Sequence, residues 1–164
     1  MDLEILKSEI DNIKLKTDEL KSLVKQFKKI IILGNGGSNA IASHISVDYT
    51  KFLKIPTTTF TNTPMLTAYT NDYGQDEAYR QFLSDFYTPN TLIIFISSSG
   101  NSPNIINAAK YCENNKIPFM ALSGFDSSNK LNQTNAIFKY HVSSKSYGVV
   151  EIAHEIMLHS IVDN

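Results

Sequence analysis

The chain has 164 residues, of which 42% are hydrophobic and 19% are charged, as expected for one globular domain that folds without disulfides or a structural metal. Its 15 Lys and Arg against 16 Asp and Glu give a net charge of −1, which excludes intrinsic disorder and a strongly basic surface for nucleic acid. The longest apolar runs, residues 30–33 and 92–96, are far shorter than the ~20 residues that span a bilayer, so we expect no membrane partner.

The first 29 residues predict one long helix. Apolar residues recur at steps of three and four, at Leu3, Leu6, Ile10, Ile13, Leu20, Val24 and Phe27. This heptad spacing is typical of a helix with one apolar stripe, and Asp2 can cap its start. The stripe can pair with another subunit or pack on the chain's own core, and both alternatives stay open. We interpret residues 1–29 as an oligomerisation helix and residues 30–164 as the main domain.

From residue 30 onward, short apolar runs alternate with helical segments. The sequence predicts strands over residues 30–33, 57–60, 92–96, 117–122 and 136–141, and helices over residues 39–53 and 149–162. This repetition of strand, turn and helix predicts right-handed crossovers and a parallel sheet covered by helices on both faces. We therefore expect an α/β domain with a five-stranded parallel sheet and a preceding N-terminal helix.

The compartment can be inferred from cysteine use and from the amino terminus. Cys112 is the single cysteine, and Asp2 and Glu4 stand where a secretory signal would be basic. A small-residue cleavage site after an apolar stretch is also missing from this region. These features predict a reducing, cytoplasmic setting.

Two strand-to-helix turns carry residues suited to binding an anion. Residues 97–102 (SSSGNS) offer four hydroxyl groups and backbone N–H groups where a helix begins near Pro103. This run has no Lys or Arg, so a phosphate would be held by hydroxyls and the helix end. The alternative is a serine-rich turn with a good N-cap. Residues 34–38 (GNGGS) form the companion turn, whose glycines allow close approach of a ligand, although the spacing matches no nucleotide-binding motif.

Two of the expected helices carry histidines together with carboxylates. His44 and Asp48 are four residues apart and share one helix face. The last helix carries four titratable residues, Glu151, His154, Glu155 and His159. Glu151 and His159 lie within about a quadrant of each other, whereas His154 and His159 diverge. Such groups can supply an acid and a base, or the ligands of a divalent metal, and the alternative is two exposed polar helix faces.

Four segments in this order resemble the sugar-isomerase (SIS) domain of bacterial phosphoheptose isomerases. They are residues 34–38, residues 71–74 (NDYG), residues 97–102 and the closing pattern ExxHxxxxH from Glu151 to His159. The resemblance extends from residue 30 to nearly the end of the chain. It implies a flavodoxin-like three-layer sandwich and a homotetramer with active sites at subunit contacts. It also implies a phosphorylated sugar as the ligand.

The resemblance implies a role for each matching position. The residues that would contact the substrate are Asn35, Gly36, Gly37, Ser38, Asp72, Ser97, Ser98, Ser99 and Ser102. The serines of the second turn would grip the phosphate, and Asp72 would bind sugar hydroxyls. The implied reaction interconverts ketose and aldose phosphates through an enediol, with sedoheptulose 7-phosphate giving D-glycero-D-manno-heptose 7-phosphate for surface polysaccharide.

Catalysis and metal binding are implied for the two polar helices. His159 matches the catalytic histidine of the family, and Asp48 matches its glutamate partner. Some members bind zinc, for which the matching ligands are His44, Asp48, Glu151 and His159. We therefore expect zinc as a cofactor and His159, Asp48 and Glu151 as catalytic residues.

Three positions depart from the family pattern and keep other functions open. Asp48 is one methylene shorter than glutamate, Glu151 replaces a glutamine, and Gly148 stands where the family has an aspartate. Glu151 is either a metal ligand or the catalytic base. If Glu151 is the base, Asp48 serves only as a metal ligand. The alternative to an isomerase is a non-catalytic SIS module that binds a phosphosugar or a protein partner, like the relative that binds the replication initiator DnaA. A third hypothesis is an isomerase or epimerase that acts on another phosphosugar.

Overall fold

The computed structural model of the protein describes residues 2–162. Its elements in chain order are α1 (Leu3–Val24), β1 (Lys29–Gly34), α2 (Gly37–Asp48), the π-helical segment η1 (Tyr49–Leu53), β2 (Thr57–Thr59), α3 (Thr63–Tyr73), α4 (Ala78–Phe86), β3 (Thr91–Ser97), α5 (Pro103–Asn114), β4 (Phe119–Gly124), β5 (Phe138–Val142) and α6 (Tyr147–His159).

The sheet has five parallel strands in the order β2-β1-β3-β4-β5. The central pair, β1 and β3, is in register from Lys29 opposite Thr91 to Gly34 opposite Ile96. The expected α/β fold with five parallel strands is confirmed. Because the strand order reverses between β1 and β3, the carboxyl ends of these two strands form the topological switch point of the sheet.

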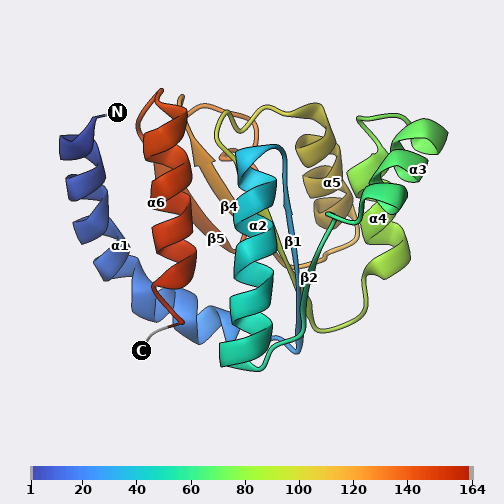
Figure 1. The fold of residues 1–164 in the computed structure, drawn as a ribbon, viewed down its shortest axis with the longest axis horizontal. Helices are drawn as coiled ribbons and strands as arrows, with labels where there is room; N and C mark the ends of the chain where they lie inside the picture. The colour runs from blue at the N-terminus through green and yellow to red at the C-terminus, as the bar shows by residue number, and fades with distance from the viewer. Residues whose placement is uncertain (1, 163–164) are drawn as a thin grey trace.

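Helices cover both faces of the sheet, and the central strands carry uninterrupted apolar runs at residues 30–33 and 92–96. Ile30 and Ile32 of β1 join the cluster that contains α1, α2 and α6, whereas Ile31 and Leu33 join the cluster formed with α4 and α5. Figure 1 shows α1, α6 and α2 together on one side of the sheet, and α5, α4 and α3 on the other. The helices after β1 and β3 therefore leave the switch point toward opposite faces, which opens a crevice between them.

Several element boundaries differ from the sequence prediction. The helix expected over residues 39–53 begins at Gly37, because Gly36 has a φ of 53° and precedes the first helical turn, and it ends as the π-helical segment η1. The strand expected from residue 117 begins at Phe119, since Pro118 has no N–H to donate to a ladder. The crossover from β2 to β3 contains two helices separated by Gly74, whose φ is 80°.

The apolar stripe of α1 is only partly buried. Ile13, Leu20 and Val24 pack into the core with α6, while Leu3 and Ile10 are 61% and 39% exposed. Figure 1 shows α1 beginning beside α6 and passing along the lower edge of the molecule. The division into residues 1–29 and 30–164 stays a prediction, and residues 1, 163 and 164 lie outside the described part of the chain. Within residues 2–162, no helix is both long and apolar enough to cross a membrane.

Candidate functional site

The two turns singled out in the sequence meet at the switch point. They line one pocket of about 220 Å³, together with the start of α6. Its lining residues are Asn35, Gly36, Gly37, Ser38, Ile96, Ser97, Ser98, Ser99, Ser102, Tyr147 and Glu151. The structure thus brings together eight of the nine residues expected to contact the substrate. The ninth, Asp72, is exposed near the end of α3 and accepts a hydrogen bond from the Asn71 amide at 2.9 Å.

The serines of the β3–α5 turn fall into two groups. Ser97 Oγ accepts a hydrogen bond from the Gly100 N–H at 3.2 Å, and Ser99 Oγ accepts one from the Asn101 N–H, so both shape the turn. Ser98 Oγ is buried and has no partner among residues 2–162. Ser102 is the N-cap residue of α5, and its hydroxyl makes no capping hydrogen bond. The hydroxyls of Ser98 and Ser102 are therefore the two in this turn that the described chain leaves without a hydrogen bond, and both residues line the pocket.

The two turns are joined by a pair of asparagines. The Asn35 amide donates to Asn104 Oδ1 at 3.0 Å, and the Asn104 amide donates to Asn35 Oδ1 at 2.8 Å. Asn104 also accepts a hydrogen bond from the Ile105 N–H, which anchors the pair to the first turn of α5. Sequence reasoning missed Asn104, and the chain holds no spacing signal that links two amides 69 residues apart.

Glu151 connects this pocket with a second cavity. Its carboxylate lies against Gly37, where an added Cβ atom would be 2.5 Å from Glu151 Oε1. A groove of about 510 Å³ extends from this point between α2 and α6, and its lining residues are Gly37, Ala40, Ile41, His44, Gly148, Glu151, Ile152 and Glu155. Because Gly37 and Glu151 line both cavities, the pocket and the groove adjoin at this contact.

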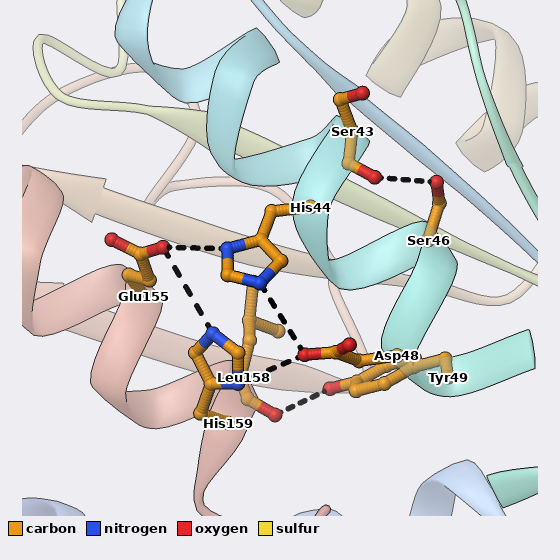
Figure 2. Close-up of polar contacts among 8 residues, drawn as sticks. All are labelled: Ser43, His44, Ser46, Asp48, Tyr49, Glu155, Leu158 and His159. Carbon is orange, nitrogen blue, oxygen red and sulfur yellow. Dashed lines mark hydrogen bonds and ion pairs between the residues drawn. The ribbon is translucent and has the colours of Figure 1, made fainter. Parts of the chain in front are cut away.

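Two histidines lie between two carboxylates beside the groove (Figure 2); His44 and Glu155 line the groove, whereas His159 and Asp48 do not. Asp48 Oδ2 lies 3.6 Å from His44 Nε2 and 3.4 Å from His159 Nδ1. Glu155 Oε1 lies 3.3 Å from His44 Nδ1 and 3.9 Å from His159 Nε2. The two imidazole rings meet edge to face, with their centroids 4.9 Å apart.

A buried tyrosine holds the helices of this cluster together. The Tyr49 hydroxyl donates a hydrogen bond of 2.9 Å to the carbonyl of Leu158, immediately before His159. Burial raises the pKa of Tyr49 well above its ordinary value, so the hydroxyl keeps the proton that it donates. The contact fixes the end of α6 against the end of α2, and with it the spacing of His159 and Asp48.

Three of the four residues expected to bind a metal are close to one another. His44, Asp48 and His159 offer ligand atoms that all lie within 4.8 Å of one another, a group able to hold a metal ion. Glu151 is not among them, because it faces Gly37 and the serine pocket. It precedes His159 by eight residues, about 12 Å along the helix. Glu155 lies beside the histidines instead, and its spacing of four residues from both Glu151 and His159 was the signal that could have indicated it.

His154 is separate from this site. It is fully buried on the inner side of α6, where its Nε2 lies 3.0 Å from the carbonyl oxygen of Ser123. Desolvation lowers the pKa of His154 to about 4, so the ring is neutral at physiological pH. The predicted divergence of His154 from His159 is confirmed.

The fold and the pocket define a class of protein: a parallel α/β sandwich with a serine-lined pocket at its switch point. Comparison with known proteins identifies the family. The model of the SIS domain matches residues 3–124. The phosphoheptose isomerase of Aliarcobacter butzleri is 33% identical over 152 residues, which cover 86% of this chain and 78% of that protein. The chain therefore belongs to the SIS domain family, as its motifs predicted.

Other relatives agree with this assignment. The phosphoheptose isomerase of Buchnera aphidicola subsp. Schizaphis graminum is 31% identical over 135 residues, or 76% of this chain and 70% of that protein. The structure of phosphoheptose isomerase GmhA from Neisseria gonorrhoeae superposes with a TM-score of 0.88 at 25% identity, covering 98% of this chain and 90% of that one. The resemblance therefore holds for sequence and fold alike.

Proposed function

We propose that this protein is an isomerase that interconverts ketose and aldose phosphates. Its first candidate reaction is sedoheptulose 7-phosphate to D-glycero-D-manno-heptose 7-phosphate. One observation carries the proposal: the unpartnered Ser98 hydroxyl and the Glu151 carboxylate line the same pocket, so an anion-binding group and a candidate base face one ligand. The relatives named phosphoheptose isomerase support the choice of substrate.

The phosphate is assigned to the β3–α5 turn. There the hydroxyls of Ser98 and Ser102 and the N-terminal end of α5 supply hydrogen bonds and a partial positive charge. No Lys or Arg lines this pocket of the described chain. The carboxylate of Glu151 would therefore face the sugar end of the ligand, because its charge repels the phosphate.

The carbon chain is assigned to the groove between α2 and α6. Isomerisation moves one proton from C1 to C2 of the ketose, and a second proton moves between the two oxygens. We assign the transfer of the carbon-bound proton to Glu151, because Glu151 lines both the pocket and the groove. The acidic groove offers carboxylates and an imidazole along the path of the sugar, from Glu151 to Glu155 and His44.

The two histidines and Asp48 beside the groove fit a divalent cation such as zinc. His44, Asp48 and His159 would hold it, and their carboxylate and imidazole donors are those that zinc prefers. A bound cation would supply a Lewis acid that polarises a sugar oxygen. In the competing assignment, Asp48 and His159 transfer the protons themselves and Glu151 only contacts the sugar.

Incubation of the purified protein with sedoheptulose 7-phosphate and with shorter ketose phosphates, with and without zinc, tests the proposal. We expect aldose formation with at least one of them, and no turnover of any would contradict it. Glu151→Gln should abolish turnover while zinc still binds. If His159→Gln abolishes turnover in metal-free protein and Glu151→Gln does not, the competing assignment is correct.

Self-association is a second part of the proposal. Because Asp72 lines neither the serine pocket nor the groove of the single chain, we propose that its contact with sugar hydroxyls forms only in an assembled oligomer, a homotetramer. The exposed residues at the start of α1 offer apolar surface for such contacts.

One observation favours the alternative of a phosphosugar-binding module without turnover. His159 and Asp48 line neither the serine pocket nor the groove, so the family's acid and base positions stand apart from the proposed phosphate site. Tight binding of a sugar phosphate without any turnover would select this alternative.

A further inference from the structure

Glu155 occupies a place in the histidine cluster that neither the motifs nor the family pattern assigned. Figure 2 shows its carboxylate on the side of the two imidazole rings opposite to Asp48. One nitrogen of each ring faces Asp48 Oδ2, at 3.6 Å for His44 and 3.4 Å for His159. The other nitrogen of each ring faces Glu155 Oε1, at 3.3 Å and 3.9 Å.

This arrangement contains more acceptors than neutral imidazoles can satisfy. A neutral imidazole has one N–H and one lone pair, whereas an ionised carboxylate only accepts. Two neutral histidines therefore supply two N–H groups, although all four ring nitrogens face carboxylate oxygens. If both N–H groups point to one carboxylate, both nitrogen lone pairs point to the second carboxylate, which they repel. A cation bound between these lone pairs and the second carboxylate removes this repulsion.

The positions of the ligand atoms indicate which side the cation takes. His44, Asp48 and His159 form the group whose donor atoms lie within 4.8 Å of one another. Glu155 would then accept the N–H of His44 and face that of His159 at 3.9 Å, a carboxylate–histidine–metal arrangement that orients the rings and raises their basicity. The charges also balance, because two carboxylates compensate a divalent cation.

We propose that Glu155 is a positioning residue of the metal site: it accepts the Nδ1–H of His44 and attracts the Nε2–H of His159, 3.9 Å away, and so directs the opposite nitrogens toward a cation shared with Asp48. The inference rests on the metal site of the proposed function and replaces Glu151 with Glu155 as the supporting carboxylate of α6. In this arrangement Glu151 is not a metal ligand, and its carboxylate remains available to a ligand in the serine pocket.

Titration calorimetry with Zn²⁺ tests this role without using turnover. We expect Glu155→Ala to weaken zinc binding by about 10- to 100-fold, and Glu155→Gln, which keeps an acceptor oxygen, to weaken it less. Glu151→Gln is the matched control on the same helix and should bind zinc within about threefold of the original protein. Thermal melts of each variant check that the fold is intact.

The tautomers give a second readout that a merely structural residue would not change. In zinc-loaded protein with ¹⁵N-labelled histidine, we expect the proton on Nδ1 of His44 and on Nε2 of His159. The opposite tautomers would overturn the inference. So would an unchanged zinc affinity in Glu155→Ala, an equal loss of zinc affinity in Glu151→Gln, or no zinc binding by the original protein.

The proposed function fails separately. If zinc binding depends on Glu155 but the protein turns over no sugar phosphate, only the proposed isomerase function is contradicted. If turnover proceeds without zinc, the role of Glu155 is still decided by the binding measurements.

Discussion

Neighbouring serines at the end of β3 have different tasks. Ser97 Oγ holds the turn through its hydrogen bond from the Gly100 N–H, whereas Ser98 Oγ has no partner in the described chain although it is buried. A buried hydroxyl without a partner is costly unless a ligand satisfies it. We therefore expect Ser97 to contribute to the stability of the fold and Ser98 to contribute to ligand binding.

We expect Ser98→Ala to raise the KM for the phosphosugar by about 10-fold or more, since it removes a hydrogen bond to a charged group. The unfolding free energy of Ser98→Ala should not fall, because the substitution removes no internal hydrogen bond. Ser97→Ala is the matched control and should lower the unfolding free energy by about 1 kcal/mol. Steady-state kinetics and urea unfolding measure both effects, and a stability loss without a KM change in Ser98→Ala would contradict this division.

His154 makes the stability of the fold depend on pH. Its pKa is about 4 in the folded protein against an ordinary value of 6.5, because the ring is desolvated. As pH falls from 6.5 toward 4, the unfolded chain binds a proton that the folded chain does not, so stability is present above pH 6.5 and is lost below it, by roughly 3 kcal/mol in all.

Urea unfolding between pH 7 and pH 4.5 measures this loss. The variant His154→Leu should lose stability at pH 7, because its contact with the Ser123 carbonyl is gone, and should show a flatter pH dependence. Equal pH dependence in both proteins would show that other groups cause the loss.

At the scale of elements, the contact between α2 and α6 sets the shape of the site. Gly37 lies so close to Glu151 that an alanine there would push the carboxylate aside. We expect Gly37→Ala to lower kcat/KM about 100-fold, as displacement of a catalytic group by about 1 Å can do. The unfolding free energy of Gly37→Ala should stay close to that of the original protein, because the flexible Glu151 side chain can move and alanine has a higher helix propensity than glycine.

Steady-state kinetics and urea unfolding of Gly37→Ala measure these effects. Val47→Ala is a suitable control on α2, because Val47 is 58% exposed and lines neither the pocket nor the groove, and it should keep most of the activity. Unchanged kcat/KM in Gly37→Ala would show that Glu151 need not occupy its observed place.

The sequence predicted the elements that build the site better than the side-chain arrangement within it. Apolar runs located all five strands, and parallel topology required the turns at residues 34–38 and 97–102 to meet at one edge. The contact of Glu155 with His44 depends on how α6 is rotated against α2, which periodicity alone does not determine. The same limit applies to Asn104, whose partner Asn35 lies on another strand-to-helix turn.

At the scale of the whole molecule, the unburied part of the α1 stripe bears on assembly. We expect the protein to elute with four times its chain mass of 18.4 kDa, and Leu3→Lys with Ile10→Lys to reduce that mass by charging exposed apolar surface. Leu15→Lys is the control, because Leu15 is 84% exposed and lies off the stripe. Light scattering coupled to size-exclusion chromatography reads out the mass, and a monomeric original protein would contradict the proposed assembly.

Exchange of solvent deuterium into the sugar, followed by NMR, tests the central claim most directly. In D₂O with sedoheptulose 7-phosphate, a switch-point pocket that holds the phosphate and presents a base to C1 should place deuterium on C1 of the ketose and C2 of the aldose. The exchange should slow in Ser98→Ala and disappear in Glu151→Gln. A sugar phosphate that binds while no deuterium enters either carbon would contradict the account.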